Sequence, residues 1–268
     1  MSKPLTAMES VSCESCHGAA SNWERSHTRP DYSHAQRVVA GMRDLQNLYI
    51  RANSCVACHQ VVSSQLLKAG HPELIFELDG QTQAQPRHWA EKHDYNRAQA
   101  WLVGQAVALR EMSAQLLAEK NPEPSLVQRW SSLKWLVQQA RVISPTADHL
   151  VSLTDDMSRS NLEAVHRIAD QFAKETSEAE WNDKQTQQLL KRLSSIAGEF
   201  RGNPSPALSA RRAERLVLAL DRITASLPEA DAKKLDTSIK QLFALAQVLA
   251  DFKPDTFAHK LDELAAKL

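Results

Sequence analysis

The chain has 268 residues, 43% of them hydrophobic, which is enough for two domains or for one domain with a long helical extension. Lys and Arg together number 32, as do Asp and Glu, so the overall charge gives no reason to expect nucleic acid or a membrane surface as a partner. No apolar run approaches the roughly 18 residues of a transmembrane helix, and the opening MSKPLTAMES lacks the apolar segment of a signal peptide.

The first 96 residues are predicted to form short helices and loops. Prolines and glycines interrupt this stretch, and no long amphipathic period runs through it. Such a segment buries little apolar surface by itself, so a bulky bound group at its centre would help to order it. It also holds all four cysteines of the chain and seven of its ten histidines. We therefore expect the chemistry of the protein to lie in this N-terminal part.

The cysteines form two identical Cys-x-x-Cys-His units, CESCH and CVACH. Two thiols at this spacing can each add to one vinyl group of a haem, and the histidine that follows is then held under the iron as its proximal ligand. The sequence thus predicts two covalently attached c-type haems that supply the missing interior of the N-terminal segment. The predicted thioether cysteines are Cys13, Cys16, Cys55 and Cys58, and the predicted proximal ligands are His17 and His59.

The four cysteines allow three other interpretations. A zinc site would have to bridge 38 residues between the two pairs, far beyond the usual ribbon spacing, and would leave the paired histidines unexplained. A thioredoxin-like motif needs a βαβ context that the sequence lacks. Structural disulfides remain an alternative, although this spacing closes only very small loops.

The order of motifs over about residues 9–118 resembles multihaem c-type cytochromes of the cytochrome c-554-like group. The resemblance rests on CESCHGAASNWERSHTRP, GMRD, CVACHQ, KAGHPELIFEL, PRHWAEK and WLVGQAVALRE. It implies an extracytoplasmic electron carrier with mainly bis-histidine haems in close contact. It also implies that His27, His71 and His88 stand where distal ligands are expected. Relatives with this pattern tend to carry a further haem motif after the helix at 97–119, and no cysteine lies there in this chain.

Two irons therefore have three candidate distal ligands. We favour His27 and His71, because they lie 10 and 12 residues beyond their motif histidines in loop-like settings, and we keep His88 in reserve. Which haem each would serve is left open. Weaker candidates are His34, His93 and Met42.

The ligand set bears on function. If protein ligands occupy both irons, the protein only relays electrons; if one iron is open, it is instead a dihaem reductase or peroxidase-type enzyme. Attachment of c-type haem takes place outside the bacterial cytoplasm, so we expect a periplasmic or otherwise extracytoplasmic protein whose export signal is absent from the given chain. The expected partners are redox proteins, and no nucleic acid is expected.

Residues 97–268 are predicted to form six or seven helices of an α-helical bundle. Hydrophobic residues recur there at helical spacing, and a serine followed by a proline marks helix starts at 144–145 and 205–206. The charge-rich stretch SARRAERLVLALDR is interpreted as an ordinary solvated helix face. The expected fold is thus all-α, with a loop-rich dihaem cytochrome c module at 1–96 and a bundle at 97–268 used for docking, self-association or covering the haem module. The strongest stripes are Leu126, Trp130, Leu133, Val137 and Ala140; Leu189, Leu193, Ile196 and Phe200; Leu216, Leu220, Ile223 and Leu227; and Leu235, Ile239, Leu242, Ala246 and Leu249.

Overall fold

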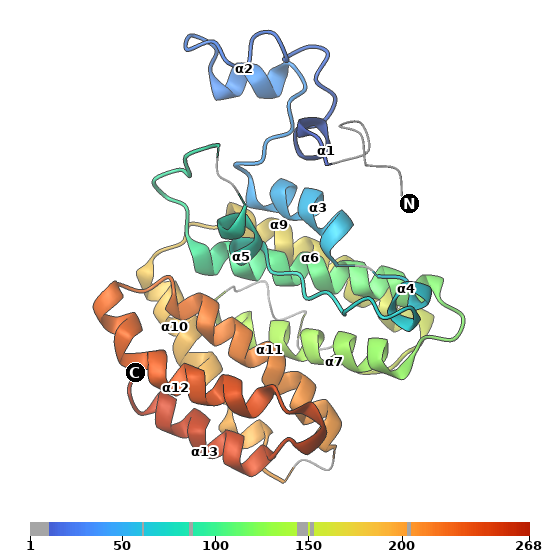
Figure 1. The fold of residues 1–268 in the computed structure, drawn as a ribbon, viewed down its shortest axis with the longest axis vertical. Coiled ribbons are helices and arrows are strands. Elements are labelled where there is room, and N and C mark those ends of the chain that lie inside the picture. Colours follow the sequence, from blue (N-terminus) through green and yellow to red (C-terminus); the bar gives the residue numbers. More distant parts are fainter. Residues whose placement is uncertain (1–10, 61, 86–87, 144–149, 151–152, 203–204) are drawn as a thin grey trace, which may run out of the picture.

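A computed structural model describes residues 11–60, 62–85, 88–143, 150, 153–202 and 205–268 (Figure 1). Every regular element in these ranges is helical, which confirms the all-α fold class. The N-terminal helices are short, and α1 and α2 lie at the opposite end of the molecule from α12 and α13. These first elements are α1 (Cys13–His17), α2 (His34–Val39), α3 (Leu48–His59), α4 (Ser64–Lys68) and α5 (Leu78–Ala84).

Seven α-helices are described from residue 97 onward, in agreement with the expected six or seven. The helix expected at 97–119 is α6, and the start expected at 205–206 is confirmed, with Pro206 in the first turn of α11. The start expected at 144–145 lies outside the described residues. The elements are α6 (Arg97–Ala118), α7 (Pro124–Gln139), α9 (Arg159–Glu178), α10 (Asp183–Ser194), α11 (Pro206–Thr224), α12 (Glu229–Ala246) and α13 (Pro254–Ala265), with 3-10 turns η2 (Ala140–Ile143), η4 (Ala197–Glu199) and η5 (Leu249–Asp251).

Helix α6 is the centre of the structure. Most of its positions are buried, because α9 runs along one side while α3, α5, α7 and α11 pack against the others (Figure 1). A helix covered on nearly every side is mostly apolar, and most of the buried positions of α6 are apolar. Gly104 lets α5 approach closely, since a Cβ at this position would lie 2.8 Å from the Cβ of Leu78. The N-terminal helices α3 and α5 are therefore anchored directly on the bundle.

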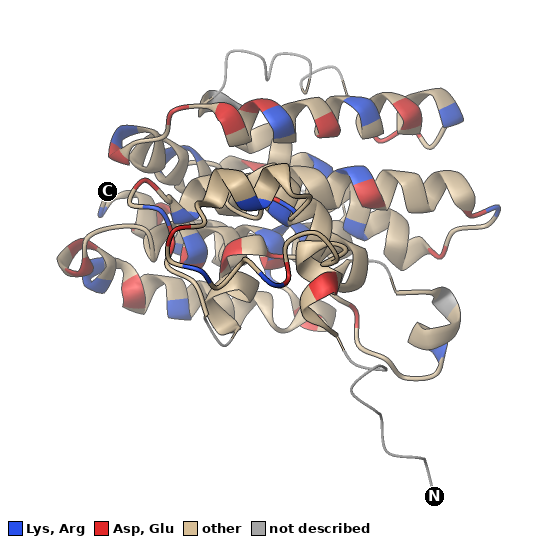
Figure 2. Ribbon diagram, turned by 90° about the horizontal axis from the view of Figure 1, so that it is seen from above, with Lys and Arg blue, Asp and Glu red and all other residues tan. Residues whose placement is uncertain are grey.

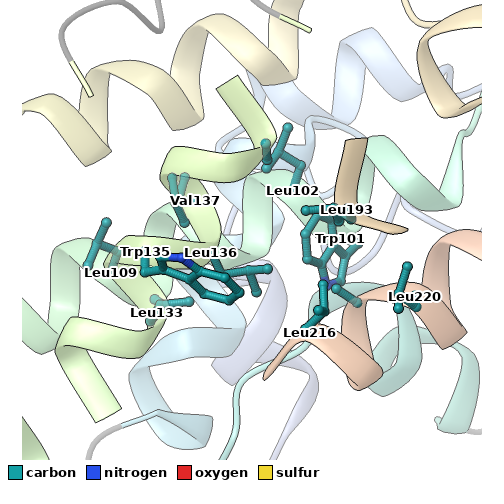
Figure 3. Close-up of a cluster of buried hydrophobic side chains, with 14 of the residues drawn as sticks. Trp101, Leu102, Leu109, Leu133, Trp135, Leu136, Val137, Leu193, Leu216 and Leu220 are labelled. Atoms are coloured by element: carbon teal, nitrogen blue, oxygen red, sulfur yellow. The ribbon is translucent and has the colours of Figure 1, made fainter. Parts of the chain in front are cut away.

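The predicted hydrophobic stripes form the core between the helices. Trp101 of α6 lies beside Leu193 of α10 and Leu216 of α11, and all three are buried (Figure 3). The stripe that begins on α10 continues beyond the end of that helix at Ser194. Its last member, Phe200, packs 4.8 Å from Phe257 of α13, measured between ring centroids.

Acidic and basic positions are interspersed along the bundle helices (Figure 2). The expectation for SARRAERLVLALDR is wrong in one respect, because Arg215 on α11 is buried rather than solvated. No helix in the described part of the chain is both long and apolar enough to cross a membrane.

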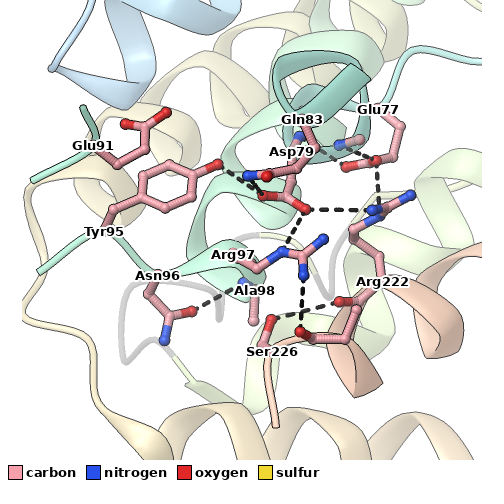
Figure 4. Close-up of polar contacts among 12 residues, drawn as sticks. Glu77, Asp79, Gln83, Glu91, Tyr95, Asn96, Arg97, Ala98, Arg222 and Ser226 are labelled. Atoms are coloured by element: carbon pink, nitrogen blue, oxygen red, sulfur yellow. Dashed lines mark hydrogen bonds and ion pairs between the residues drawn. The ribbon is translucent and has the colours of Figure 1, made fainter. Parts of the chain in front are cut away.

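A buried polar network joins α5, the segment before α6, and α11 (Figure 4). The fully buried carboxylate of Asp79 accepts hydrogen bonds from Tyr95 at 2.8 Å and from Arg97 Nε at 3.0 Å. Arg222 of α11 lies 3.5 Å from Asp79 and pairs with Glu77 at 3.0 Å. These contacts cross the predicted limit at residue 96, and the division into two domains stays a prediction.

Candidate functional site

Each Cys-x-x-Cys-His unit is helical. The first is helix α1 itself, and the second forms the last turns of α3. Helical residues at i, i+3 and i+4 share one face, so the two thiols and the histidine of each unit are directed to the same side of the backbone. A double thioether with an axial histidine needs this arrangement. The thiols of Cys13, Cys16, Cys55 and Cys58 are all free.

The two units lie side by side because Arg43 ties them together. Its backbone N–H donates to the carbonyl oxygen of His17 at 2.8 Å, where α1 ends. Its guanidinium donates to the carbonyl oxygen of Cys16 at 3.0 Å and to Ser54 Oγ on α3 at 3.3 Å. At the end of α1, Gly18 adopts a φ of 79°, which glycine accommodates without strain.

The thiol of Cys55, in the second unit, lies near the thiol of Cys16 in the first unit. Burial raises its pKa to about 11, and the neighbouring thiols of Cys16 and Cys58 act in the same direction. A thiol held protonated in this way is a poor nucleophile at neutral pH. Cys55 is therefore not placed as a redox-active thiolate, which disfavours the thioredoxin-like interpretation.

Three of the predicted histidines meet around the first unit. The ring of His17 lies 6.0 Å from that of His88 and 6.1 Å from that of Trp23, measured between centroids. Trp23 in turn lies 5.6 Å from His27, and Trp89 lies 5.1 Å from His88. The pKa of His17 is lowered, first by burial and then by His88 and His27.

This cluster contains buried polar atoms without a partner. Nδ1 of His17 and the indole N–H of Trp23 make no hydrogen bond, although Trp23 is only 3% exposed. Two imidazoles that bind one metal from opposite sides, each with its nitrogen about 2 Å away, have ring centroids about 6 Å apart. The separation of His17 from His88 fits this value. The separation of His17 and His88 is therefore compatible with two imidazoles on one haem iron, and the similar separation of His17 and Trp23 shows that ring packing also produces such a distance.

His27 and His71 share a feature of metal-binding histidines. Nδ1 of His27 donates to the carbonyl oxygen of Glu24 at 2.5 Å, and Nδ1 of His71 donates to that of Pro72 at 2.7 Å. In a neutral imidazole this leaves Nε2 unprotonated and able to bind a metal, which is the usual arrangement of ligating histidines. The ring orientation of both side chains therefore suits a ligand.

The histidine of the second unit is more exposed than that of the first, whereas each unit has one exposed and one partly exposed cysteine. His59 and Cys58 are exposed at the end of α3, and His71 is exposed in the segment that follows α4. Among the described residues, no ring contact joins His59 to another histidine. The structure therefore gathers His17, His27 and His88 but leaves His59 and His71 apart.

The weaker candidates have other surroundings. Nε2 of His34 lies 2.9 Å from Asp44, and His93 is exposed. In the described ranges, no three His, Cys, Asp or Glu side chains gather in a way that could hold a metal ion, so the zinc interpretation finds no such group there.

The role of Arg43 was not found from the sequence. Its contacts join residues that lie 27 and 11 positions away, and no local pattern marks them. Comparisons with protein-family models, with curated proteins and with solved structures found no match for this chain. The resemblance to the cytochrome c-554-like group accordingly rests on the quoted motifs alone.

Proposed function

We propose that this protein is a dihaem c-type cytochrome that transfers single electrons between redox partners in the periplasm or another extracytoplasmic compartment. The observation that carries the proposal is the pair of helical Cys-x-x-Cys-His units, each with two free thiols and a histidine on one face. When bound, haem supplies an iron that gains and loses one electron.

The chain's own residues then have the following roles. In the first unit, Cys13 and Cys16 would hold the porphyrin and His17 would bind the iron. His88 is the distal ligand that the ring separation favours, with His27 as the competing candidate. Trp23 packs between His17 and His27 and keeps water from this side of the site.

In the second unit, Cys55 and Cys58 would hold the porphyrin and His59 would be the proximal ligand. His71 is the distal candidate, since its Nδ1–H is already engaged by a carbonyl. Arg43 holds the two units next to each other, and this closeness favours electron exchange between the two sites.

The alternative is a dihaem reductase or peroxidase-type enzyme with one open iron. The observation in its favour is the exposure of His59 and the lack of any ring contact to it among the described residues. An iron held only by His59 would leave a coordination position for a small molecule.

A pyridine haemochrome count, the mass of the denatured protein and low-temperature electron paramagnetic resonance on one sample test both functions. Two haems per chain, a mass equal to the polypeptide plus two haems, and purely low-spin ferric signals support the electron carrier. A high-spin component that disappears on addition of cyanide supports the enzyme. A colourless denatured protein with the mass of the bare polypeptide contradicts both. The double variants Cys13→Ala/Cys16→Ala and Cys55→Ala/Cys58→Ala should each lose one haem.

A further inference from the structure

A second cluster of charged side chains lies away from the two cysteine units, where α7 and α11 meet the segment between α4 and α5. Arg211 and Arg215 are one turn apart on α11, and Arg129 faces them from α7. Arg211 lies 3.1 Å from a carboxylate oxygen of Glu73 and 3.2 Å from one of Glu214. Arg129 lies 3.6 Å from the other oxygen of Glu73.

Arg215 is the unusual member of this cluster. It is 3% exposed, and both terminal nitrogens of its guanidinium are buried without a hydrogen-bond partner. Nε of Arg129, a residue that is 5% exposed, is unpartnered as well. Burial lowers the pKa of Arg215 to about 10, and Glu214 offsets this only in part. Arginine nevertheless stays charged at neutral pH, and a buried charge without a partner is strongly unfavourable.

The charges of the cluster do not balance. Three guanidinium groups face the carboxylates of Glu73 and Glu214, so one positive charge is left over. Ordered water would satisfy the free N–H groups but would leave this charge in place. A small anion satisfies both needs, because the planar guanidinium binds two oxygens of a carboxylate or phosphate at once.

The members of the cluster differ in their exposure to solvent. Arg211, Glu73 and Glu214 are partly exposed at the outer side, whereas Arg129 and Arg215 are buried behind them. Because the guanidinium nitrogens that lack partners are the buried ones, a ligand for them has to be a small oxyanionic group without a large apolar body.

We propose that this arginine cluster is a binding site for a small oxyanion of the phosphate or carboxylate class, with Arg215 as its principal ligand and Arg129 as its second donor. Glu73 and Glu214 neutralise part of the positive charge and limit the site to one negative charge. The site is independent of haem attachment, since none of its residues belongs to the cysteine units.

The test is thermal unfolding of the full-length protein in chloride buffer, with phosphate or acetate added at constant ionic strength. At an anion concentration about a hundred times Kd, the midpoint should rise by about 5 °C for a chain of this size. Arg215→Met keeps the length of the side chain without its N–H groups and should lose the response. Arg167→Met, on an exposed position of α9, is the matched control and should keep it.

Isothermal titration calorimetry then identifies the ligand class. A response to phosphate alone or to acetate alone supports the proposal and assigns the chemistry, and Arg215→Lys should weaken binding by about tenfold because the bidentate fork is lost. No response to either anion at matched ionic strength overturns the proposal. An equal response in Arg215→Met and Arg167→Met also overturns it. Because Met suits a buried apolar site, Arg215→Met should remain at least as stable as the wild type in chloride alone.

Discussion

Replacing Asp79 by Asn tests whether the buried network holds the His88 segment on the bundle. The carboxylate of Asp79 is the anionic partner of Arg97 and a second partner of Arg222. In the variant, Arg222 would still pair with Glu77. Breaking a buried ion pair costs about 3–5 kcal/mol, and since the Arg97 side chain is 31% exposed, we expect a smaller cost of about 2–3 kcal/mol. The unfolding midpoint should fall by about 4–6 °C.

The assay is equilibrium unfolding in urea or by heat, followed by circular dichroism at a helix wavelength. The matched control is Asp236→Asn, which removes an exposed i,i+4 pair with Lys240 and should change the free energy of unfolding by less than about 0.5 kcal/mol. A double-mutant cycle with Arg97→Met isolates the pair. If Asp79→Asn is as stable as Asp236→Asn, the carboxylate is not what fixes the segment, and the reasoning is refuted.

Three further predictions concern pH, packing and ligation. Burial opposes ionisation of Asp170, but hydrogen bonds from α3, α6 and α9 outweigh it and lower the pKa of this carboxyl to about 2. The stability that ionised Asp170 contributes is therefore present above pH 4 and is lost as the pH falls toward 2. Asp170→Asn should flatten this part of the stability–pH curve by about 1–2 kcal/mol, measured by urea unfolding at pH 2 to 5. Gly104→Ala should destabilise the protein by about 1–2 kcal/mol, because the added Cβ would lie 2.8 Å from the Cβ of Leu78 on α5. The control, Gly198→Ala, places its Cβ in open space and should be nearly neutral. Equal unfolding midpoints for the two variants would contradict the close packing of α5 on α6. His88→Ala should convert one low-spin ferric signal to high spin while His27→Ala leaves it low spin, and the opposite result in electron paramagnetic resonance would make His27 the distal ligand.

The helices were predictable because their signals are local. The stripe from Leu126 to Ala140 gave a helix at the right place, and all of its members are buried. The stripe from Leu189 to Phe200 was right about burial but extended past the end of α10 at Ser194, because a turn can direct apolar side chains to the same core as the helix before it.

Within the candidate site, only the two cysteine units could be located from the sequence, and covalent haem attachment stays a prediction. The Cys-x-x-Cys-His spacing is local, so it could be read directly, whereas the approach of His88 to His17 depends on how α5 and α6 place a segment 71 positions further along the chain. The burial of Arg215 was missed for the same reason: its neighbours on α11 suggest a solvated face, and only the packing of α7 against α11 shows otherwise.

The position of α6 at the centre has a practical consequence for dissecting the protein. A truncated product ending at residue 96 would keep both cysteine units but would expose to water the faces of α3 and α5 that α6 covers, including Leu78, and also Phe76 in the segment before α5. Exposed apolar patches of this kind promote aggregation. Recombinant work on the cysteine units should therefore use the whole polypeptide, and inactivating substitutions, rather than deletions, should be used to separate the contributions of its two halves.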